Sequence, residues 1–417
     1  MGNTIYRNEK EILQMMENVK GVLQRLADQG MRTVRQNAFS DMCKEIFESI
    51  HIVNKELFIL DTLKINRAER LLADPDAALE LKDLISEMEE WINLCHETIL
   101  RREGCKNYLD VRFYRLIDMI DHCDYEAVYR HVCDELKGKH ADIRKALNAF
   151  YQYYHYFWGS LDIERDSFET VELRLKELIG HRDDFVWLFE ELGDYRSKYV
   201  LTGFLEYWIN YDPGETLGRI RETMYGDYFD LDLIEVSEDE VLVDLGAYTG
   251  DTVQEFIRSY NRYKEIYCFE VSPHNVTQMK EELAEFDNIH LIQKAAGAGK
   301  GTIQMKIEEA VSTDNSLSSD HKGRLMDIEI VTVDEEVSVP VTMIKMDIEG
   351  AEADALAGCR EHIQREQPKL MISVYHNNTD IWKISRMVRE MYPGYRLYLR
   401  ANGRQWGPSE IVLFALP

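Results

Sequence analysis

Two acidic residues and two glycines around residue 250 form a pattern that suits a nucleoside-containing cofactor. Residues 244–250 read Asp-Leu-Gly-Ala-Tyr-Thr-Gly, which has the form D-x-G-x-x-x-G. Gly246 permits a sharp turn after a buried strand, and Gly250 lets backbone approach a ligand where a side chain would collide. Glu270 ends the next predicted strand, where its carboxylate can accept hydrogen bonds from both ribose hydroxyls. The alternative is a tight strand–helix turn with an exposed glutamate.

The acidic residues beside the glycines discriminate between nucleoside cofactors. A dinucleotide site favours G-x-G-x-x-G, with a pyrophosphate at the helix N-terminus. This chain instead has Asp244 before the first glycine and Asp251 directly after the second. Carboxylates here would repel a pyrophosphate but suit the ammonium and sulfonium of S-adenosylmethionine. We therefore expect S-adenosylmethionine, and a nicotinamide-dependent dehydrogenase is disfavoured.

These residues belong to a C-terminal region in which predicted strands alternate with predicted helices. Strands are predicted at 240–246, 266–270, 290–295, 341–347 and 369–375, and helices at 251–260, 273–286, 353–363 and 380–391. Such alternation predicts a parallel sheet with helices on both faces, and the segment between the third and fourth strands is predicted to be irregular. The last two strands, 395–400 and 411–416, are joined through Asn402-Gly403 without a helix and must be antiparallel. This terminal hairpin fits a methyltransferase sheet better than a dehydrogenase sheet.

Residues 225–417 resemble the FkbM family of S-adenosylmethionine-dependent methyltransferases. The resemblance lies in Val243–Thr252, Phe269–Pro273 and Ile344–Glu352, and further in Asp227–Asp230 and Ser373–His376. The chain departs from the family after Glu270, where the family often has Glu-Pro and this chain has Glu-Val-Ser-Pro. The resemblance implies the α/β class I methyltransferase fold, a Rossmann-like doubly wound sheet, and methyl transfer, usually to a hydroxyl oxygen.

On the matching positions the resemblance implies a cofactor site. Its predicted members are Asp244, Gly246, Tyr248, Gly250, Asp251, Thr252, Glu270, Ala295 and Asp347. Asp347 would lie beside the methionine part and the transferred methyl group. The topology places the adenine ring near residues 294–296, after the third strand.

Methyl transfer to a hydroxyl needs a general base, or a metal ion that lowers the hydroxyl pKa. The candidates are Asp347, Glu349, His376 and Glu352, although Glu352 could equally cap the following helix. The fourth and fifth strands are neighbours in this topology, so Asp347 and His376 should end at one rim. We hypothesise that His376 is the base, with an ordinary pKa near neutrality, oriented by one of these carboxylates. A divalent metal on Asp347, His376 and Asn377 is the rival, and a histidine satisfied at the sheet rim is the structural alternative.

The first half of the chain is predicted to be helical. Apolar residues recur at three- and four-residue steps over 12–26, 39–63, 77–100, 111–119, 125–136, 143–157, 171–179 and 185–211. We place an all-helical domain at 1–225, with a break near 105–125, and the methyltransferase domain at 226–417. The helical domain could be a substrate lid, a docking platform for a partner protein or a homodimer interface, and the sequence does not distinguish among these roles.

Two segments outside the motifs could contact a substrate. Residues 149–158 contain a dense run of aromatic residues, which we interpret as interhelical core rather than a ligand platform, with His155 packed inside it. The polar insert 314–324 could cover a substrate or be a solvated surface loop.

Composition excludes several classes of partner. Lys plus Arg number 49 against 76 Asp plus Glu, a net charge of −27, which argues against nucleic acid or an anionic membrane surface. No apolar run approaches the roughly 18 residues of a membrane span, and the N-terminus has no signal-peptide core. Seven cysteines without a C-x-x-C pair suggest reduced, mostly buried thiols. We expect a cytoplasmic protein.

The sequence therefore predicts an S-adenosylmethionine-dependent O-methyltransferase. Its acceptor, by the resemblance, is a small-molecule or glycan hydroxyl, on a sugar, glycan or secondary metabolite, and transfer to nitrogen stays open. The alternative is a helical interaction protein that carries a cofactor-binding but inactive methyltransferase module.

Overall fold

The computed structural model describes residues 105, 107–122, 125–211, 224–226, 228–235, 237–260, 262–307, 324–402 and 409–417. Contacts divide the chain into two compact units, Met1–Asp124 and Tyr125–Pro417. Helix α5 (Tyr108–His122) belongs to the first unit and contains the predicted stripe 111–119. The stripes predicted over 12–26, 39–63 and 77–100 lie outside the described residues.

The second unit begins with helices at the stripes predicted from residue 125 onward, although the stripes 143–157 and 185–211 are each divided between two helices. They are α6 (Tyr125–Gly138), α7 (Ala141–Tyr153), α8 (His155–Trp158), α9 (Glu169–Gly180), α10 (Arg182–Glu191) and α11 (Tyr195–Asn210), with the short 3-10 helix η1 (Ile163–Arg165) before α9. Asp194 caps α11 by accepting a hydrogen bond from the Ser197 N–H at 2.7 Å. These helices belong to the same compact unit as the sheet, and the domain boundary at 225 stays a prediction.

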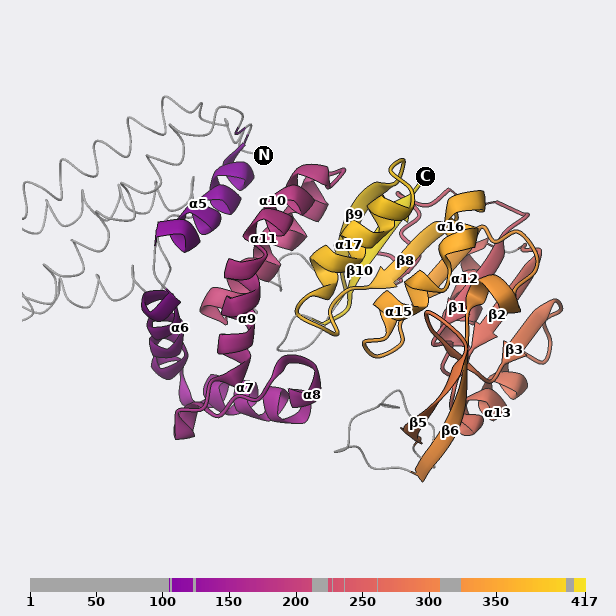
Figure 1. Ribbon diagram of the computed structural model, residues 1–417, viewed down its shortest axis with the longest axis horizontal. Coiled ribbons are helices and arrows are strands. Elements are labelled where there is room, and N and C mark those ends of the chain that lie inside the picture. Colours follow the sequence, from indigo (N-terminus) through magenta and orange to yellow (C-terminus); the bar gives the residue numbers. More distant parts are fainter. Residues whose placement is uncertain are drawn as a thin grey trace, which may run out of the picture. The chain divides into compact units, whose positions relative to one another are not determined.

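A seven-stranded sheet forms the centre of this unit (Figure 1). Its strands are β1 (Val241–Leu245), β2 (Glu265–Phe269), β3 (Ile289–Ile292), β7 (Met343–Met346), β8 (Lys369–Ser373), β9 (Arg396–Ala401) and β10 (Ile411–Leu416). The order is β3-β2-β1-β7-β8-β10-β9, with β10 antiparallel to both neighbours and the other pairings parallel. The predicted parallel sheet with a terminal antiparallel pair is confirmed, while Gly403 of the predicted connection lies outside the described residues.

Helices connect the parallel strands. They are α12 (Asp251–Tyr260), α13 (Pro273–Glu282), α14 (Val333–Glu336), α15 (Glu352–Ala357), α16 (Arg360–Glu366) and α17 (Asp380–Met391). The prediction of a single helix over 353–363 is wrong, because the helix is interrupted between α15 and α16. Gly358 lies at this break, where a Cβ would lie 2.1 Å from the Gly297 carbonyl oxygen.

Both faces of the central strands are buried. Every residue of β1 is buried, as parallel sheets covered by helices require. On one face Leu242, Ile266 and Met343 pack with Val253 and Phe256 of α12. The sheet core therefore holds the ends of β1, β2 and β7 in a fixed relation, and the predicted site residues lie at these ends.

A second, three-stranded sheet replaces the irregular segment predicted between the third and fourth strands. Its strands are β4 (Ala295–Ala296), β5 (Gly301–Ile307) and β6 (Arg324–Val331), in the order β4-β6-β5. The hairpin β5–β6 extends away from the main sheet (Figure 1). Ile303, Met305 and Ile307 alternate with polar residues, a strand signal that the prediction missed. Residues 314–323 of the predicted polar insert lie outside the described residues.

Helix α11 covers the edge strand β9. The Gly193 N–H donates to the Leu397 carbonyl at 2.8 Å, and the Leu399 N–H donates to Ser197 Oγ at 2.9 Å. Buried Arg400 binds Asp194 Oδ2 at 2.9 Å and Asp230 Oδ2 at 2.6 Å. These contacts satisfy backbone groups that an open sheet edge would leave unpaired.

Two expectations from composition can be compared with the described residues. Cys133, Cys268 and Cys359 are buried and Cys105 is half-buried, all as free thiols, whereas Cys43, Cys95 and Cys123 lie outside the described residues. No helix in the described part of the chain combines the length and the apolar character needed to cross a bilayer.

Candidate active site

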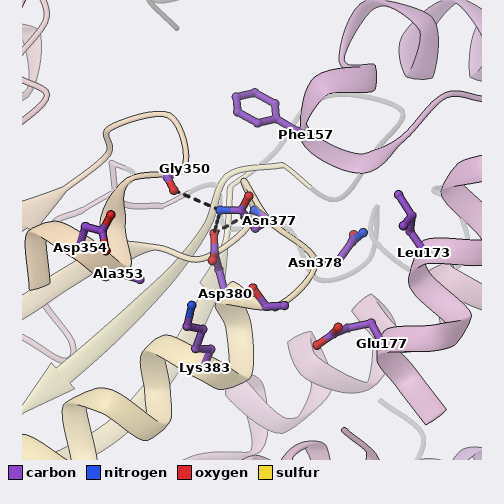
Figure 2. Close-up of a pocket in the computed structure, with 11 residues that line it drawn as sticks. Phe157, Leu173, Glu177, Gly350, Ala353, Asp354, Asn377, Asn378, Asp380 and Lys383 are labelled. Atoms are coloured by element: carbon purple, nitrogen blue, oxygen red, sulfur yellow. Dashed lines mark hydrogen bonds between the residues drawn. The ribbon is translucent and has the colours of Figure 1, made fainter. Parts of the chain in front are cut away.

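Two adjoining cavities lie at the carboxyl ends of the central strands. The larger, of about 1080 Å³, is lined by Gly246, Glu270, Asp347 and His376 among others. The smaller, of about 450 Å³, shares four lining residues with it, including Phe157 and Asn377 (Figure 2). Residues that the sequence predicts at the ends of separate strands thus meet in one cavity, as expected for this class of sheet.

Most of the predicted cofactor residues line the larger cavity. These are Gly246, Tyr248, Asp251, Thr252, Glu270, Ala295 and Asp347. Asp244 and Gly250 are not among the lining residues. At Gly250 φ is +88°, and a Cβ would lie 2.9 Å from Leu283 Cδ1. Glycine is therefore required at this position by the backbone conformation and by packing, rather than by the ligand approach that the sequence suggested.

The turns after β1 and β7 touch each other at Gly246. There φ is +81°, and a Cβ would lie only 1.8 Å from the Asp347 carbonyl oxygen. Tyr248 and Glu349, in the same two turns, have φ of +48° and +56°. Non-glycine residues in this left-handed region cluster at functional sites. Both turns are therefore held in conformations that the surrounding structure must stabilise.

A buried ion pair joins β1 to β7. Lys345 Nζ lies 2.9 Å from Asp244 Oδ1, and these side chains are 2% and 0% exposed. The same ammonium donates to the Gly246 carbonyl at 2.8 Å. Burial opposes the charge on Lys345, but Asp244 and Asp347 outweigh it and raise the Lys345 pKa. Through Lys345, Asp244 therefore helps to hold the turn after β1 in place. The sequence offers one signal for this pair, because Lys345 is the one lysine in an apolar strand.

Glu270 ties the end of β2 to the turn after β1. Its Oε2 accepts a hydrogen bond from the Tyr248 N–H at 3.0 Å, and its Oε1 accepts one from the Ser272 N–H at 2.7 Å. Burial raises the Glu270 pKa, against the effect of these donors. Glu270 also lines the larger cavity, so its carboxylate lies within reach of a ligand bound there.

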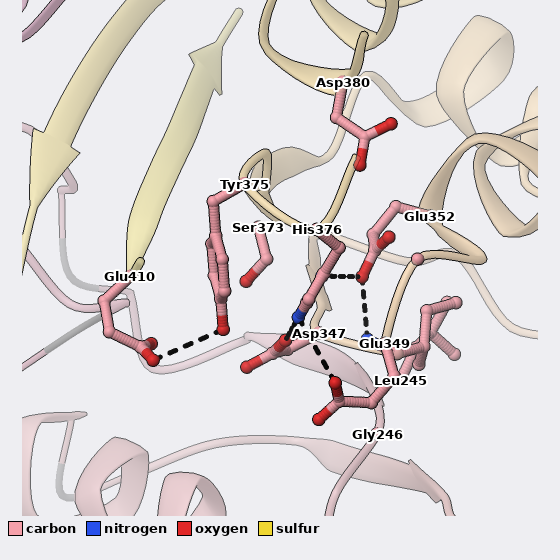
Figure 3. Close-up of polar contacts among 12 residues, drawn as sticks. Leu245, Gly246, Asp347, Glu349, Glu352, Ser373, Tyr375, His376, Asp380 and Glu410 are labelled. Atoms are coloured by element: carbon pink, nitrogen blue, oxygen red, sulfur yellow. Dashed lines mark hydrogen bonds and ion pairs between the residues drawn. The ribbon is translucent and has the colours of Figure 1, made fainter. Parts of the chain in front are cut away.

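His376 lies among three carboxylates (Figure 3). Its Nδ1 is 2.9 Å from Glu352 Oε1, and its Nε2 is 3.5 Å from Asp347 Oδ1 and 3.6 Å from Glu349 Oε2. Burial opposes a charge on the ring, but the carboxylates outweigh it and raise the His376 pKa to about 10. The ordinary pKa expected from the sequence is therefore wrong, because His376 is an imidazolium at neutral pH.

Two further groups hold this cluster in place. Glu352 is fully buried, and its Oε1 also accepts a hydrogen bond from the Ile348 N–H at 2.9 Å. The Tyr228 hydroxyl donates to Asp347 Oδ2 at 2.6 Å. Burial would raise the Asp347 pKa, but His376, Lys345 and this hydroxyl lower it, so Asp347 is ionised. Tyr228 lies about 120 residues before Asp347 in the chain, a separation that sequence reasoning could not bridge.

The residues around His376 can be compared with the predicted metal site. Ligand atoms of Asp347, Glu352 and His376 lie within 4.8 Å of one another. The Asn377 amide instead donates to the Gly350 carbonyl at 3.2 Å and to Asp380 Oδ2 at 3.0 Å. A metal ion here would thus use Glu352 in place of Asn377. A protonated His376 supplies one positive charge among the three carboxylates Asp347, Glu349 and Glu352.

The aromatic run at 149–158 divides between core and cavity wall. Phe150 and Tyr151 are buried, as predicted, whereas Tyr154, Tyr156, Phe157 and Trp158 line the larger cavity. The Trp158 indole N–H donates to the Tyr375 carbonyl at 2.7 Å, and the Phe157 ring centroid lies 5.1 Å from that of His376. The interpretation as core is therefore incomplete. His155 is half-buried rather than packed inside the run, and its Nδ1 lies 2.9 Å from the Gln152 carbonyl oxygen.

Comparisons with known proteins agree with this geometry. The family description "Methyltransferase FkbM domain" matches residues 244–405. No curated protein matches the chain significantly. Among solved structures, methyltransferase FkbM from Methylobacillus flagellatus is similar over 58% of this chain, at 22% identity and a TM-score of 0.50. The match covers 62% of that protein, less than two thirds of its length.

More distant matches cover the sheet region. An rRNA methylase from Streptococcus thermophilus has 14% identity and a TM-score of 0.28, over 43% of this chain and 88% of that one. Fibrillarin from Aeropyrum pernix with bound S-adenosylmethionine has 13% identity and a TM-score of 0.28, over 43% and 67%. The family match and the strand order carry the assignment. Residues 244–405 of the chain form a methyltransferase domain of the FkbM family, and the resemblance predicted from the sequence is confirmed.

Proposed function

We propose that the chain is an S-adenosylmethionine-dependent O-methyltransferase that acts on a hydroxyl of a sugar, glycan or secondary metabolite. The observation that carries the proposal is the position of His376. Its Nδ1 is held by Glu352, and its Nε2 faces Asp347 and Glu349 in the cavity that also contains the turn after β1. A titratable ring nitrogen and a cofactor turn thus share one cavity.

The polar groups of the larger cavity suit S-adenosylmethionine. Gly246 lines the cavity, and Glu270 is placed to accept hydrogen bonds from ribose hydroxyls. Ala295 lines the part of the cavity where we place adenine. Asp251 and Asp347 supply negative charge for an ammonium and a sulfonium. When bound, S-adenosylmethionine supplies a methyl group on an activated sulfonium.

His376 is the proposed base, acting through Nε2. Because its pKa is raised to about 10, the imidazolium must lose a proton before the ring can accept one from the acceptor hydroxyl. Glu349, with Oε2 at 3.6 Å from Nε2, is the second candidate for this proton. Asp347, held by Tyr228 at 2.6 Å, keeps its carboxylate fixed beside both groups.

The aromatic wall supports a sugar-like acceptor. Tyr154, Tyr156 and Phe157 present rings to the cavity, and the carboxylates of Glu349 and Glu410 line it as well. A sugar offers C–H faces that pack on aromatic rings and hydroxyls that donate to carboxylates. Pockets that combine apolar walls with a few polar groups bind such ligands with defined orientation.

Calorimetric titration with S-adenosylmethionine, followed by methyl-transfer assays on candidate acceptors, tests the proposal. We expect binding of S-adenosylmethionine and not of NADH, weakened in Glu270→Ala, and product methylated on oxygen. The control is Glu265→Ala, which removes a carboxylate from the opposite end of the same strand. A folded protein that binds no S-adenosylmethionine would contradict the proposal and favour a helical interaction protein with an inactive module. A product methylated on nitrogen would contradict the O-methylation.

A further inference from the structure

The smaller pocket adjoins the proposed active site and has its own set of polar groups (Figure 2). One side comes from α8 and α9, through Phe157, Leu173 and Glu177. The other side includes Asn378 and Lys383, from the turn after β8 and from α17. The two cavities meet at Phe157 and Asn377, and Asn377 directly follows His376. The pocket therefore begins one residue from the proposed base.

Several side chains in this pocket are available to a ligand. Three of these side chains have no hydrogen-bond or ion-pair partner within the part of the chain that the structure describes: those of Asp354, Asn378 and Lys383. Leu173 lines the pocket and is 41% exposed, so it presents apolar surface there. In Figure 2 the Lys383 ammonium points toward the space beside Asn377. Unpartnered polar groups and exposed apolar surface thus occur together in one concave site.

The charges favour a neutral, polyhydroxylated ligand over an anion. Glu177 and Asp354 supply carboxylates, burial raises the pKa of Asp380 to about 7, and Lys383 is the lysine among the lining residues. A phosphate or carboxylate ligand would meet more negative than positive charge here. Amide, ammonium and carboxylate groups can together bind several hydroxyls. The volume of about 450 Å³ lies within the usual range for sites of small ligands.

We propose that the smaller pocket is a subsite for the sugar unit next to the one that is methylated, so that the acceptor contains at least two linked units. This inference rests on the proposed function, because it takes the larger cavity as the site of methyl transfer. Phe157 contacts both units in this arrangement, since it lines both cavities and its ring lies 5.1 Å from that of His376. The helices before the sheet then help to select the acceptor.

Binding can be tested without turnover. The full chain is saturated with S-adenosylhomocysteine and applied to an array of mono-, di- and longer saccharides, and the best ligand and its single-unit fragment are titrated by calorimetry. The Asn378→Ala/Lys383→Ala variant removes two polar groups from the pocket. Lys280→Ala is the matched control, because Lys280 is an exposed lysine of α13 outside both cavities.

We expect the wild type to bind the two-unit ligand about tenfold or more tightly than the single unit. The double variant should lose most of this preference, whereas Lys280→Ala and the affinity for S-adenosylhomocysteine should be unchanged. Equal affinity for one and two units, or an unchanged preference in the double variant, would overturn the subsite and leave the proposed function standing. If S-adenosylhomocysteine binds and no saccharide does, the sugar acceptor and the subsite both fall. If S-adenosylhomocysteine does not bind, the proposed function falls, and the subsite with it.

Discussion

Nδ1 of His376 lies 2.9 Å from Oε1 of Glu352, and the same oxygen accepts the Ile348 N–H at 2.9 Å. Glu352 begins α15 after β7, whereas His376 follows β8. One fully buried carboxylate therefore connects the turns after two neighbouring strands. Because Glu352 occupies Nδ1, it determines that Nε2 is the ring nitrogen that faces Asp347 and Glu349.

The raised pKa of His376 predicts an alkaline pH profile. The imidazolium predominates below about pH 10 in the cofactor-free protein, so raising the pH supplies the neutral base. We expect kcat/KM, which reports the pKa values of the free enzyme, to rise with pH toward about 10. Glu352→Gln removes the carboxylate that raises this pKa most, so the rise should move toward lower pH.

The matched control for that profile is Glu361→Gln, which changes an exposed glutamate of α16. Its pH profile should equal that of the wild type. A wild-type profile that is already flat at pH 7, or a profile unchanged in Glu352→Gln, would contradict the role assigned to this pair.

The buried ion pair predicts a large loss of stability when one partner is removed. Lys345→Met leaves Asp244 buried and unpaired, which should lower the free energy of unfolding by about 3–5 kcal/mol. The double variant Asp244→Asn/Lys345→Met should recover part of that loss, because no unpaired charge is left. Urea denaturation measures both values, with Lys264→Met, an exposed lysine, as control. A loss below 1 kcal/mol in Lys345→Met would be inconsistent with a buried pair.

A side chain at position 246 should weaken cofactor binding. An added Cβ would collide with the Asp347 carbonyl oxygen, at 1.8 Å, in a backbone conformation that L residues rarely adopt. We expect Gly246→Ala to weaken S-adenosylmethionine binding by about tenfold or more in calorimetry. Gly301→Ala is the control, since a Cβ there meets nothing within 4 Å. Equal affinities in the two variants would show that the turn tolerates the displacement.

The catalytic fold could be predicted because its signals are local. Strand and helix periods, the glycines near 246 and the missing helix before β10 all lie within short windows of sequence. Parallel pairing of β7 and β8 then brings Asp347 and His376 to one rim without further information. The alternation in β5 is also local, and the expectation of an irregular segment overlooks it.

The details of the site depend on contacts between distant residues. Trp158 reaches Tyr375 across 217 positions, and Tyr228 reaches Asp347 across 119. No short window of sequence contains such pairs, so the sequence alone favours a core interpretation of residues 149–158. The predicted pKa of His376 is wrong for the same reason, because the actual pKa depends on three carboxylates that converge in a buried space.

Tyr228 allows the positioning of Asp347 to be tested separately from its charge. Its hydroxyl donates to Asp347 Oδ2 at 2.6 Å and lies 3.2 Å from Ser373 Oγ. A hydrogen bond to a charged group contributes about 1.5–3 kcal/mol, so Tyr228→Phe should weaken S-adenosylmethionine binding by about tenfold or more. The same loss should raise the Asp347 pKa, because this hydroxyl helps to lower it, and binding should therefore weaken further as the pH falls.

Tyr398→Phe is the matched control, because the Tyr398 hydroxyl has no hydrogen-bond partner in the described part of the chain and its ring is half-buried. Calorimetry at several pH values measures both variants. If Tyr228→Phe weakened binding equally at every pH, the hydroxyl would act only through packing. If it bound as tightly as Tyr398→Phe, Asp347 would be held by Lys345 and His376 without Tyr228.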